Sequence, residues 1–219
     1  MSVKQPFESD QAEGLRRLFA NKAATPTQTI AFLSIERESG ASTAVQRIAI
    51  ALQKLGKTVL VVDEQEEHRA SLRLMNSKDA PFDLIERPQA RGPKFLTESE
   101  RGHEFILVDA YPSKDSMVKQ ANTVVVVSKS PIQNEDKAAA VVRATSKINA
   151  ETTLLLSQEG DSTELLKSRS VFEKICAAMK IKKIGWLGSL PVKADSQKLD
   201  EAASGMASRI VNMHQAQGS

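Results

Sequence analysis

The chain has 219 residues, of which 41% are hydrophobic and only 4% are aromatic. That is enough for one well-packed domain with an aliphatic core and a short appendage. The formal net charge of +3 is small, and the basic residues are interleaved with acidic ones. The charge therefore indicates an ordinary solvated surface and gives no reason to expect a nucleic-acid partner.

The single cysteine, Cys176, excludes an internal disulfide and fits a reducing cytoplasm. It shares an apolar stripe with Val171, Phe172 and Ile175, which predicts a buried, unreactive thiol. No apolar run is long enough to span a membrane, and the polar start MSVKQPFESD lacks a signal-peptide core. The three histidines are scattered, so no metal site is predicted. The expected location is the cytoplasm.

Residues 1–28 are predicted to be a helix and linker in front of an α/β domain at 29–219. Asp10 stands where a helix N-cap is expected, and Glu13 follows three residues later as in a capping box. An apolar stripe then follows, formed by Leu15, Leu18 and Phe19. A helix this short is marginal alone, so we expect it to gain order from the domain or from a partner.

The first part of the domain predicts a strand, a loop, a helix and a second strand. Residues 29–35 and 57–63 are short apolar runs, typical of strands buried on both faces. Residues 43–55 carry apolar side chains at helical spacing, and Gly56 ends that helix. Such a crossover places the loop and the helix N-terminus at the carboxyl edge of the sheet, where phosphate groups bind.

The loop between that first strand and helix lacks most of the residues that cradle a phosphate. Such a loop needs several glycines, a lysine for the terminal phosphates, and Ser or Thr for Mg²⁺. The sequence ERESGAST at 36–43 supplies one glycine, no lysine, and carboxylates at Glu36 and Glu38. Carboxylates repel a triphosphate, more strongly in a site closed against water. The sequence therefore predicts the frame of a nucleotide site whose binding chemistry has largely been lost.

Strands and helices alternate through the rest of the chain. The predicted strands are 104–109, 123–127, 152–156 and 183–187, and the predicted helices are 114–120, 135–148, 163–180 and a segment within 198–214. Prolines and glycines interrupt 76–103, and no element is assigned there. The alternation predicts a mostly parallel, doubly wound sheet with helices on both faces.

Two features of the chain resemble the MinD/ParA group of deviant Walker-A ATPases and, within it, the FlhG family of flagellar regulators, also called FleN or YlxH. The order of elements from residue 29 through the WLGSLP segment at 186–191 follows that group over most of the chain. The segment DQAEGLR at 10–16 is similar to the DQAxGLR element at the N-terminus of FlhG proteins. This element is a specific sign of the FlhG family when it precedes a MinD-like domain. The resemblance implies a P-loop fold with an N-terminal helical appendage.

The resemblance also implies a partner. In the FlhG family the N-terminal element binds the signal-recognition-type GTPase FlhF and stimulates its GTP hydrolysis, with the glutamine, here Gln11, acting at the partner's active site. An amide can orient the attacking water by donating one hydrogen bond and accepting another. The implied partner-activating residues are Asp10, Gln11, Ala12, Gly14, Leu15, Arg16 and Leu18. The alternative is an N-terminal helix that only packs on its own sheet.

The family loop, KGGxGKT, is changed at most of its functional positions. Its two lysines fall on Glu36 and Ala41, and two of its glycines fall on Arg37 and Glu38. The vestigial nucleotide site keeps Gly40, Ser42, Thr43, Asp63 and Asp109.

Positions outside the loop have changed as well. The acid that the family links to hydrolysis falls on Gln65, the γ-phosphate-sensing glycine after Asp109 is missing, and the adenine-reading asparagine is replaced near Ser157. The resemblance thus implies an ATPase-deficient domain without catalytic residues of its own or a resident cofactor. ATP and Mg²⁺ would bind only if the degenerate loop still holds them.

The implied role is the regulation of flagellar placement or number. An FlhF-type GTPase is the implied partner, with flagellar switch-ring proteins or a flagellar transcription regulator as further candidates. The family's lipid anchor is a C-terminal amphipathic helix, but residues 202–214 contain a single Arg. A helix packed on the sheet is therefore expected, with membrane association weak or indirect and recruitment to the membrane or cell pole through partners.

Two other functions stay open. One is a working ATPase in which Lys57 or Arg37 replaces the lost lysine. The other is a ParA-like DNA-partition module, which would require a basic stripe that the sequence lacks.

Overall fold

A seven-stranded sheet forms the centre of the computed structural model, which describes residues 27–65, 82–86, 102–110, 117–147, 151–158, 162–181, 184–191 and 195–217. The strand order is β3-β2-β4-β1-β5-β6-β7, and all six neighbouring pairs are parallel. The strands are β1 (Gln28–Ser34), β2 (Val59–Asp63), β3 (Asp83–Glu86), β4 (Phe105–Ala110), β5 (Thr123–Ser130), β6 (Glu151–Gln158) and β7 (Ile184–Pro191). The predicted parallel, doubly wound sheet is confirmed.

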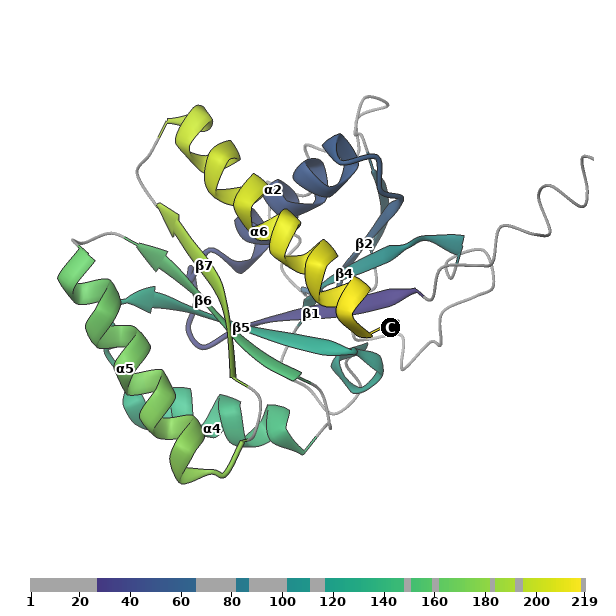
Figure 1. Cartoon of the computed structure of the whole chain (residues 1–219). Helices are drawn as coiled ribbons and strands as arrows, with labels where there is room; N and C mark the ends of the chain where they lie inside the picture. Colours follow the sequence, from purple (N-terminus) through teal and green to yellow (C-terminus); the bar gives the residue numbers. More distant parts are fainter. Residues whose placement is uncertain are drawn as a thin grey trace, which may run out of the picture.

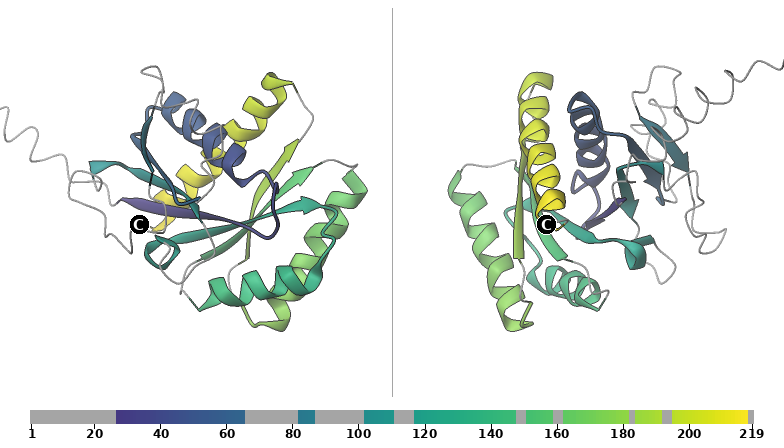
Figure 2. Two further views of the ribbon diagram at one scale, coloured as in Figure 1. Left: turned by 180° about the vertical axis from the view of Figure 1, so that it is seen from behind. Right: turned by 45° about the vertical axis from the view of Figure 1, so that its right-hand side comes forward.

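Helices cover both faces of this sheet and give the molecule three layers (Figure 1, Figure 2). On one face lie α2 (Ala41–Lys54) and α6 (Ser196–Gln217). On the other lie α4 (Glu135–Ser146) and α5 (Ser162–Ala178). A 3₁₀ turn, η3 (Met117–Gln120), stands within the segment where the sequence predicted a helix at 114–120.

Alternate residues of the central strands enter two different cores. Ile30 and Phe32 of β1 pack on the face that α2 and α6 cover, whereas Ala31 and Leu33 belong to a cluster on the opposite face. All four side chains are buried. Because both faces are covered, the strand is apolar throughout, and this is why the sequence located it.

The helix that follows β1 begins two residues earlier than predicted. Gly40 is its N-cap, with a left-handed backbone at φ +87°, and the Ala44 N–H donates to the Gly40 carbonyl at 2.9 Å. The left-handed glycine turns the chain from the loop directly into the helix. At the other end Gly56, at φ +74°, donates its N–H to the Gln53 carbonyl, as the predicted helix stop requires.

Strand β3 is the element that the sequence did not predict. It has four residues, DLIE, and pairs with β2 alone, from Leu60 opposite Asp83 to Asp63 opposite Glu86. So short a segment carries almost no periodic signal, and its pairing with β2 is a long-range contact. It forms one edge of the sheet, and β7 forms the other.

The long C-terminal helix α6 packs its apolar side on the sheet, as expected. Met206 and Ile210 are at most 3% exposed and share a core with α2. The Arg209 guanidinium donates to the Leu187 carbonyl at 2.5 Å and so ties the helix to β7. Within the parts of the chain described above, no helix is both long and apolar enough to cross a membrane.

Candidate functional site

The carboxyl edge of the sheet gathers the predicted vestigial site. Strand β1 lies between β4 and β5, so the loop after it emerges near the point where the strand order reverses, where open parallel sheets bind ligands. Asp63 ends β2, and Asp109 stands opposite it in β4. The structure places all five predicted residues at this edge: Gly40, Ser42, Thr43, Asp63 and Asp109.

The loop is held in place by its own side chains. The Glu36 carboxylate accepts the Lys129 backbone N–H at 3.1 Å, at the end of β5. The Ser39 hydroxyl, fully buried, donates to the Ser34 hydroxyl at 2.9 Å. Glu36, which occupies a position where the resemblance expects a lysine, is therefore bound to the neighbouring strand.

Two loop residues adopt a left-handed backbone: Glu38 at φ +58° and Gly40 at φ +87°. A non-glycine residue in this conformation costs about 1–2 kcal/mol. Glu38 stands where the resemblance expects a glycine. The loop therefore keeps a left-handed backbone conformation that favours glycine, although a glutamate now occupies the position. The Ser157 hydroxyl of β6 donates to the Ser39 carbonyl, and its oxygen would lie 2.7 Å from a Cβ added to Gly40. Ser157 therefore closes the space beside Gly40.

Neither lysine position of the family loop carries a cation here, and one proposed substitute lies far away. Ala41 is 1% exposed and packs into the core with α2. Lys57 precedes β2, at the amino edge, where its Nζ lies 3.0 Å from the Glu104 carboxylate. Asp63 lies six residue steps further along an extended chain, about 20 Å away. The alternative in which Lys57 replaces the missing lysine is therefore wrong. Arg37, the other substitute, is exposed in the loop.

Gln65 links the two buried carboxylates at this edge. Asp63 is 1% exposed and Asp109 is fully buried. The Gln65 backbone N–H donates to Asp63 Oδ1 at 2.9 Å, and its side-chain Nε2 donates to Asp109 Oδ1 at 3.1 Å and to the Ala110 carbonyl at 3.0 Å. The family resemblance identifies Gln65 only as a lost acid, because its contact with Asp109 spans 44 residues and leaves no local signal.

The residues at this edge do not fit Mg-ATP. Oxygen ligands of the kind Mg²⁺ prefers remain on Ser42, Asp63 and Asp109. However, Asp109 already accepts from Gln65, and Glu36 and Glu38 bring negative charge to the loop. In the described segments no group of three His, Cys, Asp or Glu side chains is arranged to hold a metal ion.

The N-terminal element lies outside the residues that the structure describes, which begin at Thr27. The partner-activating role of Asp10, Gln11, Ala12, Gly14, Leu15, Arg16 and Leu18 therefore stays a prediction.

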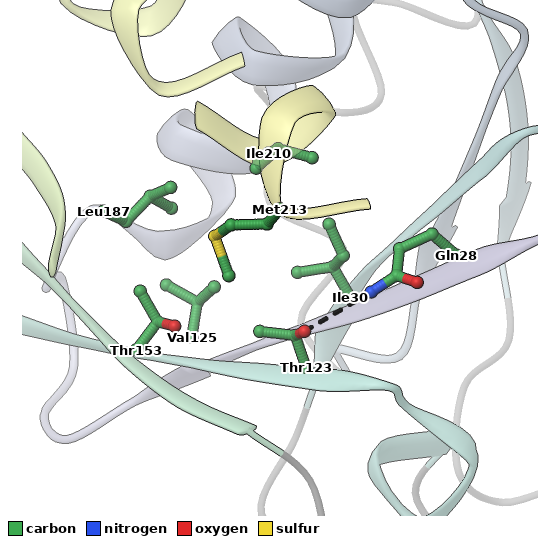
Figure 3. Close-up of a pocket in the computed structure, with 8 residues that line it drawn as sticks. All are labelled: Gln28, Ile30, Thr123, Val125, Thr153, Leu187, Ile210 and Met213. Atoms are coloured by element: carbon green, nitrogen blue, oxygen red, sulfur yellow. Dashed lines mark hydrogen bonds between the residues drawn. The ribbon is translucent and has the colours of Figure 1, made fainter. Parts of the chain in front are cut away.

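A small cavity lies beneath α6 near the amino-terminal side of the sheet, away from the loop (Figure 3). Its lining residues are Gln28, Ile30, Thr123, Val125, Thr153, Leu187, Ile210 and Met213. It has room for about one water molecule. The Thr153 hydroxyl is buried and has no hydrogen-bond partner, whereas the Thr123 hydroxyl accepts from the Gln28 amide at 3.4 Å. The size and lining indicate a packing void of the core.

Replacing Thr153 by valine should stabilise the protein. The change removes an unpartnered buried hydroxyl and keeps the shape, so the free energy of unfolding is expected to rise by about 1 kcal/mol. Thr123→Val is the matched control, because it removes the hydroxyl that accepts from the Gln28 amide and should therefore lower the free energy of unfolding. Urea unfolding of both variants measures the difference. A less stable Thr153→Val protein would show that this hydroxyl is bonded in solution.

The lone cysteine has the environment that the sequence predicted. Cys176 is fully buried beside Phe172, and burial, assisted by the charge of Glu173, raises the pKa of its thiol to about 11. Alkylation by iodoacetamide at pH 8 is expected to be at least about 100-fold slower in the folded protein than in urea, because two pKa units separate the thiolate populations. Raising the pH from 9 to 11 should also lower the free energy of unfolding, because the Cys176 thiol of the unfolded chain loses its proton at a lower pH than the buried thiol of the folded protein. Equal alkylation rates would contradict this burial.

Comparison with solved structures identifies the fold. The septum site-determining protein MinD of Pyrococcus horikoshii, solved with Mg-ADP, matches with a TM-score of 0.63 and 13% identity over 85% of this chain and 97% of that one. The MinD cell division protein of Aquifex aeolicus matches with a TM-score of 0.58 and 17% identity, over 85% of this chain and 97% of that one. A plasmid partition protein of Borrelia burgdorferi matches with a TM-score of 0.60 and 12% identity, over 86% of this chain and 99% of that one.

Sequence comparisons give no match. No family model matches the chain, and no curated protein matches it either. Identities of 12–17% establish the fold alone. The chain thus has the fold of the MinD/ParA-type P-loop ATPases, with a loop and a sheet edge that differ from a phosphate site at the positions described above.

Proposed function

We propose that this chain is a non-enzymatic regulator of flagellar placement or number, whose MinD-like domain does not turn over ATP. Its N-terminal DQAEGLR element binds an FlhF-type GTPase and stimulates GTP hydrolysis. The observation that supports the loss of ATP turnover is the contact of Glu36: a carboxylate replaces a lysine in the loop, and it is held by the Lys129 backbone N–H. The role toward the GTPase is supported by the resemblance of the segment at 10–16.

The chemistry of the loop supports the loss of ATP binding. Two like charges about 4 Å apart in a partly buried site repel each other by roughly 4 kcal/mol. The half-buried Glu36 therefore makes triphosphate binding unfavourable, the exposed Glu38 adds a weaker, solvent-screened repulsion, and Ala41 offers no compensating cation. In the resembling family the first lysine of the loop reaches across an ATP-sandwiched dimer. With Glu36 at this position, no ATP-driven dimer is expected.

The N-terminal element supplies the activity that the domain lacks. In this proposal Asp10 caps a short helix, Leu15 and Leu18 seat that helix in a groove of the GTPase, and Gln11 orients the attacking water. The α/β domain presents this helix and contributes no catalytic group. Recruitment to the membrane or the cell pole would then occur through partners.

The test is GTP hydrolysis by an FlhF-type GTPase, measured with the full chain and with a chain that lacks Met1–Ala20. The full chain should accelerate hydrolysis, and the truncated chain should have no effect although its domain stays folded by circular dichroism. Equal stimulation by both chains would overturn the proposal.

A further inference from the structure

We propose that Gln65 is a built-in clasp that takes the place of a divalent cation between the ends of β2 and β4. This inference rests on the proposed function, in which the domain works without nucleotide. It adds a physical reason why this sheet edge keeps its arrangement without metal or ATP.

The contacts of Gln65 reach both strands. Its backbone N–H binds the Asp63 carboxylate at 2.9 Å, and its side-chain amide binds the Asp109 carboxylate at 3.1 Å. The same amide nitrogen also donates to the Ala110 carbonyl at 3.0 Å. In addition, the Glu64 N–H donates to the Asp109 carbonyl at 3.1 Å, which extends the β2–β4 pairing beyond the last residue of β2.

Two buried carboxylates side by side are costly. Asp63 and Asp109 stand opposite each other on paired strands and are at most 1% exposed. Buried negative charges repel each other and must be neutralised or receive hydrogen bonds, and a bound cation is a common solution. Gln65 instead supplies N–H donors to both carboxylates without adding charge. An amide is suited to this position because a carboxylate there would add another acidic group beside Asp63, Glu64 and Asp109 and would supply no donor.

The clasp predicts that metal dependence can be introduced at one position. In Gln65→Glu the side-chain donor is lost, and a further carboxylate joins those of Asp63, Glu64 and Asp109, all of which are at most 4% exposed. Without divalent metal, the midpoint of thermal unfolding should fall by about 3 °C or more, and millimolar Mg²⁺ or Ca²⁺ should restore it. The wild-type midpoint should not respond to either ion. All samples are full-length and free of nucleotide.

Gln53→Glu is the matched control, because it makes the same charge change near the end of α2, at the opposite edge of the sheet. Its midpoint should show no metal response. The clasp is overturned if the wild type is itself stabilised by Mg²⁺, if Gln65→Glu keeps its midpoint in the absence of metal, or if both glutamate variants respond alike to the ions.

Gln65→Met keeps the experiment decisive if the glutamate variant does not fold. Methionine preserves the length and apolar stem of the side chain and removes the amide donor. Hydrogen exchange of the Glu64 amide should then accelerate about tenfold, because the β2–β4 extension loses its clasp. Unchanged exchange would overturn the inference. Failure of the GTPase assay would overturn the proposed function instead, since neither clasp measurement involves a partner or a nucleotide.

Discussion

Replacing Gln11 by alanine is expected to return GTP hydrolysis by an FlhF-type partner to its unstimulated rate. The amide is the one group that the proposal places beside the attacking water, and a positioned group that assists proton transfer or orients water contributes about 10²–10⁴ in rate. A loss of at least about tenfold in stimulation should therefore be visible in a single-turnover assay. Binding to the partner should persist, because Leu15 and Leu18 are unchanged.

Gln5→Ala is the matched control, since it removes the same amide from a position outside the DQAEGLR element. It should stimulate like the wild type. If Gln11→Ala also stimulates fully, the glutamine does not act on the partner. If Gln11→Ala no longer binds the partner, its role is in docking, and the proposed positioning of water is wrong.

Restoring the family loop is expected to create MgATP binding. The variant combines Glu36→Lys, Arg37→Gly, Glu38→Gly and Ala41→Lys. It removes two carboxylates and the Arg37 guanidinium from the loop and supplies two ammonium groups, and it lets glycine occupy the left-handed position at 38. We expect affinity for MgATP to increase at least about 100-fold, equivalent to about 2.7 kcal/mol. Isothermal titration calorimetry measures it directly.

A variant with changed charge elsewhere controls for net charge. Glu135→Lys with Asp136→Asn makes the net charge more positive by the same amount as the restored loop, at the exposed first turn of α4, and should not create MgATP binding. If the restored loop binds MgATP no better than the wild type while remaining folded, the loop chemistry is not what limits binding. The account of how this site was lost would then be wrong.

The apolar strands and the helix between β1 and β2 could be predicted because their signals are local. The runs at β1 and β2 are continuous, since both faces of the sheet are covered, and Gly56 marks the end of α2. The position of Lys57 also followed from sequence, because a residue that precedes a strand lies at the amino edge. This position is too far from the phosphate edge for Lys57 to replace the missing lysine.

The contacts that shape the site could not be read from sequence. Gln65 meets Asp109 across 44 residues, and Ser157 meets the Ser39 carbonyl across 118. Both depend on strand order, which brings β2 beside β4 and the end of β6 against the loop. Strand β3 was missed for the same reason, because it is defined by its pairing with β2 and not by a pattern of its own.

The most direct test of the central claim is calorimetry of the full, unmodified chain with ATP and Mg²⁺. Our account predicts no saturable heat up to millimolar ATP, because the loop carries the carboxylates of Glu36 and Glu38 and no lysine. A dissociation constant in the micromolar range would contradict it and would mean that this domain is still a working nucleotide switch.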